Sequence, residues 1–200
     1  MLDIKYRMEI LAENLEDAPN ALWQRNLFTS HRYKPAPRLT RIVVGVDPSG
    51  SRSGDEVGIV VVGKDIANRL FVLDDATMSN ATPLQWAAGV VSAYKKNKAD
   101  LVVAETNFGG DMVKATLDQV ERNLPFKAVS ASRGKMIRAQ PIAALYPQVD
   151  RIYHVKPFGE LEDQLCMWTP DSQWSPDRMD ALVWACTELV EGLEREWGFF

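Results

Sequence analysis

Apolar residues follow two different spacings along the chain, and the spacing changes near residue 80. Before that point, three short apolar runs at 41–47, 56–63 and 70–75 follow one another closely and predict strands. The connection between the first two runs reads PSGSRSGD, and its glycine and serine content is typical of a hairpin turn. The first two strands are therefore predicted to form a hairpin.

Beyond residue 80, helical spacing alternates with short apolar runs. Thr82, Pro83 and Gln85 form a capping-box pattern, with proline at the first position of a helix over 82–98. Further helices are predicted over 109–124, 135–148 (bent or delayed at Pro141) and 176–193. Further strands are predicted over 99–107, 126–132 and 151–156. The inward faces of the first two helices are predicted to carry Leu84, Ala87, Val91 and Tyr94, and Val113, Leu117, Val120 and Leu124. This order predicts an α/β domain with a mixed sheet.

The first 40 residues differ from the rest. A short helix is predicted over 3–17, and the basic, proline-bearing stretch HRYKPAPRLTR resembles a linker that cannot continue a helix. We therefore divide the chain into a linker segment at 1–39 and a domain at 40–200.

Composition narrows the class of protein. The chain is 46% apolar and 25% charged, it has no long uncharged apolar run, and its N-terminus has no signal-peptide core. Cys166 and Cys186 form no close pair and indicate a reducing compartment without disulfides. With only His31 and His154 as imidazoles, a zinc site is not expected. The net charge of −4 neither indicates nor excludes binding to nucleic acid.

Acidic residues end two of the strands that read as buried. Asp47 follows the run Ile-Val-Val-Gly-Val, and Glu105 ends LVVAE just before a helix. Asp180 lies in the first turn of the last helix, with Asp177 one turn earlier. Strand ends and a helix start can converge at one edge of a sheet, so the three carboxylates of Asp47, Glu105 and Asp180 form a candidate site.

Converging carboxylates need compensation for their repulsion, which is about 4 kcal/mol for two charges about 4 Å apart at an effective dielectric of about 20. Oxygen ligands without histidine or cysteine select Mg²⁺ or Mn²⁺, and two such ions can activate water and stabilise a leaving oxygen at a phosphodiester. Each residue also has a structural interpretation. Asp177 is a good helix cap, Asp47 can cap its turn, and Glu105 can pair with a neighbouring cation.

Basic residues accompany the helix predicted after 132. Arg133, Lys135 and Arg138, together with Arg52 at the hairpin tip, can hold phosphates. Charge alone favours a solvated helix face instead. The tryptophans, Trp86, Trp168, Trp174 and Trp184, are interpreted as packing residues rather than as platforms for bases.

Four stretches together resemble one known family. VVGVDPSGSRSGDEVGIVVVG, LVVAETNFGGDMV, SASRGKMIRAQPIAALY and LEDQLCMW…SPDRMDALVWACTEL are similar, in order and context, to the C-terminal nuclease domain of the large terminase subunit of tailed bacteriophages. The resemblance covers about residues 40 to 192, and ALWQRNL near the N-terminus resembles the segment that joins the ATPase and nuclease domains. The implied fold is a ribonuclease H-like mixed sheet flanked by helices, nearer to junction resolvases than to ribonuclease H itself.

The resemblance implies an activity and its residues. The family's metal-binding acidic positions fall on Asp47, Glu105 and Asp180, with Asp177 assisting, and basic positions facing DNA fall on Lys135 and Arg138. The implied activity is cutting of concatemeric double-stranded phage DNA during genome packaging, with two Mg²⁺ or Mn²⁺ ions, in the cytoplasm of the infected host. The implied partners are an ATPase domain, the portal protein and the small terminase subunit, with no membrane.

One departure from a complete large terminase limits the resemblance. The chain has no G-x-x-x-x-G-K-[ST] phosphate loop, because SRGKM lacks the first glycine and the hydroxyl, so DNA translocation is not assigned to it. We expect an isolated nuclease domain with part of its linker. Three alternatives stay open: a junction resolvase, a noncatalytic DNA-binding or docking module, and an actin-like or sugar-kinase-like nucleotide-binding domain.

Overall fold

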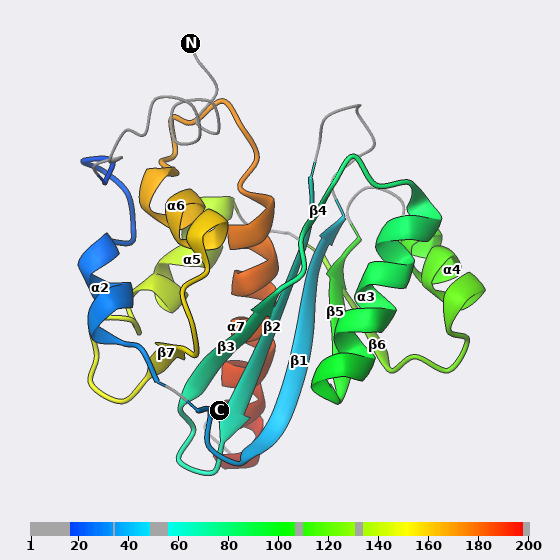
Figure 1. The fold of residues 1–200 in the computed structure, drawn as a ribbon, viewed down its shortest axis with the longest axis horizontal. Helices are drawn as coiled ribbons and strands as arrows, with labels where there is room; N and C mark the ends of the chain where they lie inside the picture. Colours follow the sequence, from blue (N-terminus) through cyan, green and yellow to red (C-terminus); the bar gives the residue numbers. More distant parts are fainter. Residues whose placement is uncertain (1–16, 34, 49–55, 107–109, 131–133, 198–200) are drawn as a thin grey trace.

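One mixed sheet forms the centre of the molecule (Figure 1). The computed structural model describes residues 17–33, 35–48, 56–106, 110–130 and 134–197. Its strands are β1 (Leu39–Pro48), β2 (Glu56–Asp65), β3 (Leu70–Asp75), β4 (Met78–Ser79), β5 (Leu101–Glu105), β6 (Phe126–Val129) and β7 (Ile152–His154). Its helices are α2 (Arg25–Ser30), α3 (Pro83–Asn97), α4 (Gly110–Val120), α5 (Lys135–Ala143), α6 (Gly159–Met167) and α7 (Asp177–Trp197).

The sheet combines antiparallel and parallel pairs in the order β6-β5-β1-β2-β3-β7, with β4 paired to β2. The pairs β1–β2 and β2–β3 are antiparallel, and the pairs β1–β5, β5–β6 and β3–β7 are parallel. This confirms the predicted α/β class with its mixed sheet. Because β1 and β5 run in parallel, their carboxyl ends lie side by side, as a site at this edge requires.

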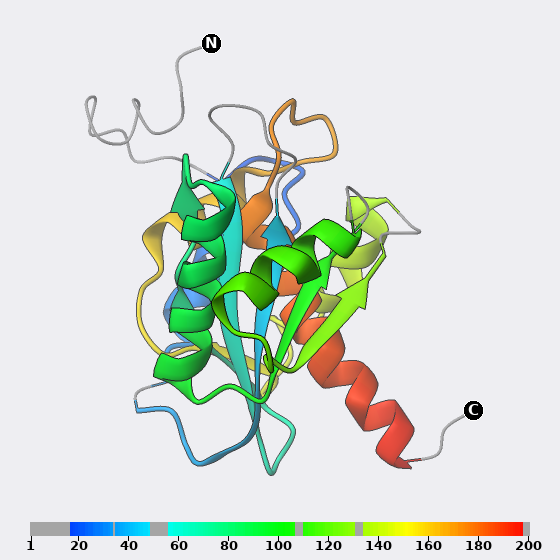
Figure 2. The same cartoon turned by 90° about the vertical axis from the view of Figure 1, so that its right-hand side faces the viewer.

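Helices cover both faces of the sheet (Figures 1 and 2). One core lies between the sheet and α3 and α4, and it includes Val44, Val90 and Leu117. The other core lies beneath α2, α5, α6 and α7. The central strands β1 and β2 are therefore buried on both sides, which explains their continuous apolar runs. Within the described ranges, no helix is long and apolar enough to span a membrane.

Two glycines let α7 lie directly on the sheet. A Cβ atom at Gly45 would stand 2.0 Å from the carbonyl oxygen of Ala181, and one at Gly58 would stand 2.0 Å from that of Asp177. No side chain fits against backbone at such distances. The glycines therefore set how closely the first turns of α7 approach β1 and β2, where Asp47 also lies.

Substitution of Gly45 by alanine should reduce stability strongly. The new methyl group meets helix backbone, which cannot turn away as a flexible side chain can, so we expect a loss of about 3 kcal/mol or more in the free energy of unfolding. Urea denaturation measures this loss. Gly159→Ala is the matched control, because a Cβ atom at Gly159 meets nothing within 4 Å. Equal stability of the two variants would contradict the close packing.

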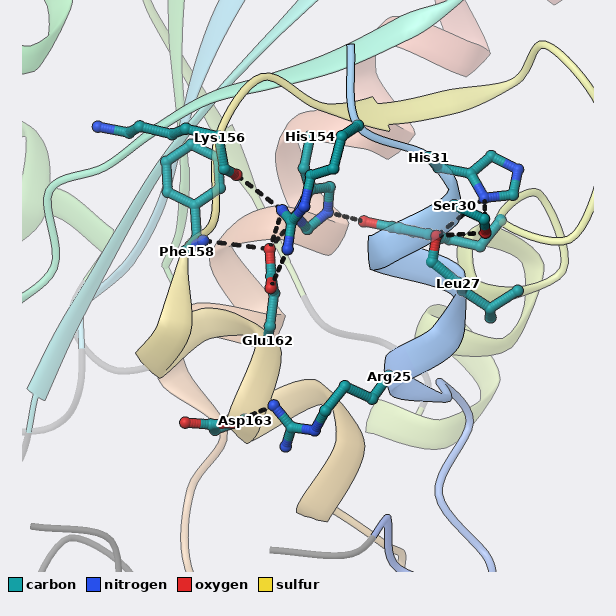
Figure 3. Close-up of polar contacts among 11 residues, drawn as sticks. Arg25, Leu27, Ser30, His31, His154, Lys156, Phe158, Glu162 and Asp163 are labelled. Carbon is teal, nitrogen blue, oxygen red and sulfur yellow. Dashed lines mark hydrogen bonds and ion pairs between the residues drawn. The ribbon is translucent and has the colours of Figure 1, made fainter. Parts of the chain in front are cut away.

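The segment before β1 packs onto the domain. Trp23 and Phe28 are fully or almost fully buried in the core beneath α6 and α7. Figure 3 marks the hydrogen bond that Arg25 Nη1 donates to Asp163 Oδ1, and the two atoms are 2.5 Å apart. The 1–39 boundary remains a prediction, but residues 17–33 contribute to the same core as the domain.

A buried polar network lies between this segment, β7 and α6. Arg32 donates to both carboxylate oxygens of Glu162, at 2.5 and 2.6 Å. Glu162 Oε1 lies 2.8 Å from His154 Nδ1 (Figure 3). Burial raises the pKa of Tyr146 well above its usual range, so its hydroxyl keeps its proton, and the hydroxyl oxygen lies 3.0 Å from His154 Nε2. Because the Glu162 carboxylate can only accept, His154 carries its proton on Nδ1 and donates it to Glu162, and Nε2 of the neutral ring accepts from the Tyr146 hydroxyl. Burial lowers the pKa of His154, which favours this neutral form.

This network should make stability fall at acid pH. Burial alone would raise the pKa of Glu162, but the hydrogen bonds from His154 and Arg32 lower it to about 2 from the ordinary 4.5. A lowered pKa gives stabilisation that is present above pH 4.5 and is lost as pH falls through about 2. We expect Glu162→Gln to cost roughly 3 kcal/mol at pH 7, with the gap closing between about pH 5 and 2.

Thermal unfolding across that pH range measures the gap. The control is Glu121→Gln, which removes a half-exposed pair with Lys95 and should cost under about 1 kcal/mol. A gap for Glu162→Gln that does not change with pH would contradict the ionised pair.

Most predicted elements are confirmed, with corrections to two inward positions, to the ends of helices and to elements that were not predicted. The capping box is present, with the Thr82 backbone N–H donating to Gln85 Oε1 at 2.8 Å. Leu84 and Val120 were predicted to face inward and are 53% and 38% exposed, because Trp86 and Val90 point to the core instead on α3, and α4 ends at Val120. The helices α4 and α5 stop before the predicted 124 and 148. The elements α2, α6 and β4 were not predicted. The helix predicted over 3–17 falls almost entirely outside the described residues.

Candidate metal centre at the carboxyl edge of the sheet

Two of the predicted acidic residues end neighbouring parallel strands. Val46 of β1 pairs with Ala104 of β5, so the residues that follow, Asp47 and Glu105, lie side by side. Asp47 is only 9% exposed, since β1 is covered on both faces. The strand register therefore places two carboxylates next to each other at one edge of the sheet.

The other two acidic residues come from the first turn of α7. Asp47 pairs with Gly58 on β2, and Gly58 packs against the backbone of Asp177. The Asp180 N–H donates to the Pro176 carbonyl at 2.9 Å, so Asp177 lies within the first turn and not at the capping position. Asp177 and Asp180 are 4% and 2% exposed. Contact between α7 and the two glycines thus brings these carboxylates to the same edge.

The electrostatics of Asp47 show that the four groups interact. Burial raises the pKa of Asp47 well above its usual value, and the charges of Asp180, Asp177 and Glu105 raise it further. Lys135 acts in the opposite direction. Asp47 is therefore held in a place where its own negative charge is unfavourable, unless a positive charge joins the group.

Two basic residues of α5 form ion pairs with Asp180. Lys135 Nζ lies 2.5 Å from Asp180 Oδ2, and Arg138 Nη2 lies 2.8 Å from Asp180 Oδ1. The side chain of Arg138 is only 12% exposed, so it does not lie on a solvated helix face. Lys135 is 38% exposed and keeps access to solvent. The two basic residues therefore lie at the site, paired with one of its carboxylates.

The donor set fits a hard divalent cation. All four acidic side chains offer oxygen only, which suits Mg²⁺ or Mn²⁺, and a double positive charge would relieve the repulsion at Asp47. Among the described residues, no three acidic, histidine or cysteine side chains already form a group that could hold an ion. Asp180 is turned toward Lys135 and Arg138, so binding of an ion requires Asp180 to exchange these partners.

Arg178 is a buried residue at the site that sequence reasoning missed. It is 5% exposed and pairs with Glu56 of β2, Glu160 of α6 and Asp75 of β3, the last at 3.1 Å. Burial lowers its pKa to about 10 and raises the pKa of Asp75. Because these partners lie up to 122 positions away, the sequence carries no local signal for the cluster.

Trp184 has a polar contact that the sequence did not suggest. Its ring is buried, as predicted for a packing residue, but its Nε1–H donates to Glu105 Oε2 at 3.1 Å. Its position four residues after Asp180, on the same side of a helix, is the one signal that could have pointed to it. Of the predicted DNA-binding residues, Arg52 and Arg133 lie outside the described residues.

Comparison with known proteins gives one family and a set of similar folds. The family model described as the terminase RNaseH-like domain matches residues 44–189. Comparison with curated proteins finds no match. The large terminase nuclease of thermophilic phage G20c shares 15% identity at a TM-score of 0.61, covering 84% of this chain and 98% of that one.

Two further structures share the fold at low identity. The nuclease domain of the large terminase subunit gp2 of bacterial virus Sf6 is 11% identical at a TM-score of 0.62, covering 83% of this chain and 98% of that one. The HK97 bacteriophage large terminase is 11% identical at a TM-score of 0.66, covering 84% of this chain and 43% of that one. With a family match across both strand-end carboxylates and the first turns of α7, the chain belongs to the terminase RNase H-like domain family.

Proposed function

We propose that this domain is a metal-dependent endonuclease that cuts concatemeric double-stranded DNA during phage genome packaging. The observation that carries the proposal is the buried Asp47, whose pKa is raised by burial and by three neighbouring carboxylates. A buried carboxyl group crowded by three others is unfavourable without a compensating positive charge, and a divalent cation supplies that charge.

The acidic residues would bind the metal ions. Asp47, Glu105 and Asp180 would hold two Mg²⁺ or Mn²⁺ ions, with Asp177 assisting. The ions supply an activated water and offset the charge that develops on the phosphate. Support comes from similar folds: structures of the G20c nuclease are described with bound magnesium, cobalt and zinc, and a variant of the Sf6 domain with calcium.

The half-exposed Lys135 would contact the DNA backbone, with Arg52 and Arg133. Such contacts position DNA without reading its sequence. By membership of this family we also propose an adjoining ATPase domain, the portal protein and the small terminase subunit as partners, and the host cytoplasm as the place of action.

Cleavage of supercoiled plasmid tests the proposal. Purified protein should nick and linearise the plasmid with Mg²⁺ or Mn²⁺ and not with EDTA. Asp180→Asn should reduce the rate at least about 100-fold, because it removes a charged ligand of the ion. The control is Asp118→Asn, which alters a half-exposed aspartate on α4 paired with Lys114 and should leave the rate unchanged.

Other outcomes of this assay would contradict the site or favour a different function. Cutting that continues in EDTA, or in Asp180→Asn, would contradict the site. Folded protein that binds DNA without metal and never cuts would favour a docking module. A marked preference for branched DNA over plasmid would favour a junction resolvase.

A further inference from the structure

Glu105 is held on one oxygen by a tryptophan of the neighbouring helix. Trp184 lies one turn after Asp180 on α7, and its indole N–H donates to Glu105 Oε2 at 3.1 Å. The ring is 7% exposed, so the contact is shielded from water. A hydrogen bond to a charged acceptor in such a place is stronger than the same bond at a surface.

Arg138 meets both members of this pair. Its guanidinium carbon lies 4.7 Å from the centroid of the Trp184 ring, within the range of a cation–π contact. Its Nη2 lies 3.6 Å from Glu105 Oε2 and 2.8 Å from Asp180 Oδ1. One arginine therefore spans two of the four carboxylates and packs on the indole that holds one of them.

Both contacts use the same oxygen of Glu105, which leaves the other oxygen for a metal ion. Both Trp184 and Arg138 approach Glu105 through Oε2. A carboxylate fixed on one oxygen can present its other oxygen to a cation in a defined orientation, and such supporting hydrogen bonds govern metal affinity. A packing residue alone would need only the ring, whereas this contact uses the indole nitrogen.

We propose that Trp184 is a positioning residue of the metal site, which orients Glu105 through its indole N–H while Arg138 holds the ring. This inference rests on the proposed function, since it gives Trp184 a role only if Glu105 binds a cation. It also assigns Arg138 to the interior of the site rather than to the DNA backbone. Trp184 touches neither the ion nor the DNA.

Calorimetric titration of the whole chain with Mn²⁺ alone tests the role. Trp184→Phe keeps a six-membered aromatic ring but removes the indole N–H together with the rest of the five-membered ring, and it should weaken Mn²⁺ binding about tenfold. Trp86→Phe is the matched control, because Trp86 is equally buried, at 8% exposure, in the core on the opposite face of the sheet. It should leave the affinity unchanged.

A double-mutant cycle separates positioning from packing. In a Glu105→Ala background, Trp184→Phe should change the Mn²⁺ affinity by less than about twofold, because the group through which it acts is gone. A loss that remains tenfold in that background would mean that Trp184 acts through general packing, and would overturn the proposal.

A second readout tests the contact without metal. The ¹⁵N–¹H signal of the Trp184 indole, identified by its absence in Trp184→Phe, should shift in Glu105→Gln and stay in place in Glu121→Gln. No shift in Glu105→Gln would overturn the contact. Wild-type protein that binds no Mn²⁺ would defeat the proposed function before any variant is made, whereas normal binding by Trp184→Phe would defeat this inference alone.

Discussion

We expect Asp47→Asn to remove nearly all cleavage and, in EDTA, to make the protein more stable. The substitution removes a central ligand of the proposed ions, so we expect the rate to fall at least about 1,000-fold, equivalent to about 4 kcal/mol of lost transition-state stabilisation. It also removes a buried charge that Asp180, Asp177 and Glu105 repel. Relief of about 1 kcal/mol would raise the melting temperature of a domain of this size by about 2–4 °C.

The gain in stability should depend on pH and on metal. The folded-state pKa of Asp47 lies well above its ordinary 3.8. The stabilisation that comes from its tighter proton binding in the folded state is therefore fully present below pH 3.8, and it is lost as pH rises through the folded-state pKa. The advantage of Asp47→Asn in EDTA should therefore grow with pH. In Mg²⁺ at about 100 times the dissociation constant, the wild type gains about 2.7 kcal/mol from binding, and the order reverses.

Thermal unfolding in EDTA and in Mg²⁺ checks both statements, alongside plasmid cleavage. The control is Asp171→Asn at an exposed position, which should change neither the rate nor the melting temperature. A variant that is less stable than the wild type in EDTA at neutral pH would contradict the account of Asp47 as an electrostatically unfavourable group.

Removal of Arg178 produces the largest loss of stability that we expect from a side chain near the site. Its guanidinium is the shared partner of Glu56, Asp75 and Glu160, which join β2, β3 and α6 to the start of α7. Arg178→Leu leaves Asp75, which is 12% exposed, without this compensation. Loss of one member of a buried ion cluster costs about 3–5 kcal/mol, so the free energy of unfolding should fall by that amount.

Urea denaturation measures the loss, and the partners provide a graded comparison. Glu160 is 64% exposed, so Glu160→Gln should cost under about 1 kcal/mol. Arg178→Lys keeps the charge and loses the planar fork, and should fall between the two. If Arg178→Leu were no less stable than Glu160→Gln, the buried cluster would not support α7 as described.

The sequence could predict the parts of the fold that depend on the local spacing of apolar residues and on helix caps. The continuous apolar runs of β1 and β2 mark strands covered on both faces, and Thr82 with Gln85 marks the start of α3. Spacing predicts burial poorly at the edge of a helical face. Leu84 and Val120 have the right spacing, but their side chains are exposed to solvent. Spacing fixes a face only to within about one residue on either side.

The candidate site was predictable where it depends on the ends of strands. Asp47 and Glu105 follow buried runs, and parallel pairing then places them side by side. What the sequence could not show is how far Lys135 and Arg138 reach into the site, because two positions on α5 are compatible with a solvated face as well as with a buried one. Arg178 escaped prediction because its partners come from three separate elements.

The measurement that tests the metal centre most directly is anomalous X-ray diffraction from crystals soaked in Mn²⁺. We expect anomalous density between Asp47, Glu105 and Asp180, with Lys135 Nζ moved away from Asp180 Oδ2, to which it lies at 2.5 Å in the present structure. Density at another place, or an intact Lys135–Asp180 pair at a Mn²⁺ concentration that supports cleavage, would contradict the assignment of these carboxylates as the metal ligands.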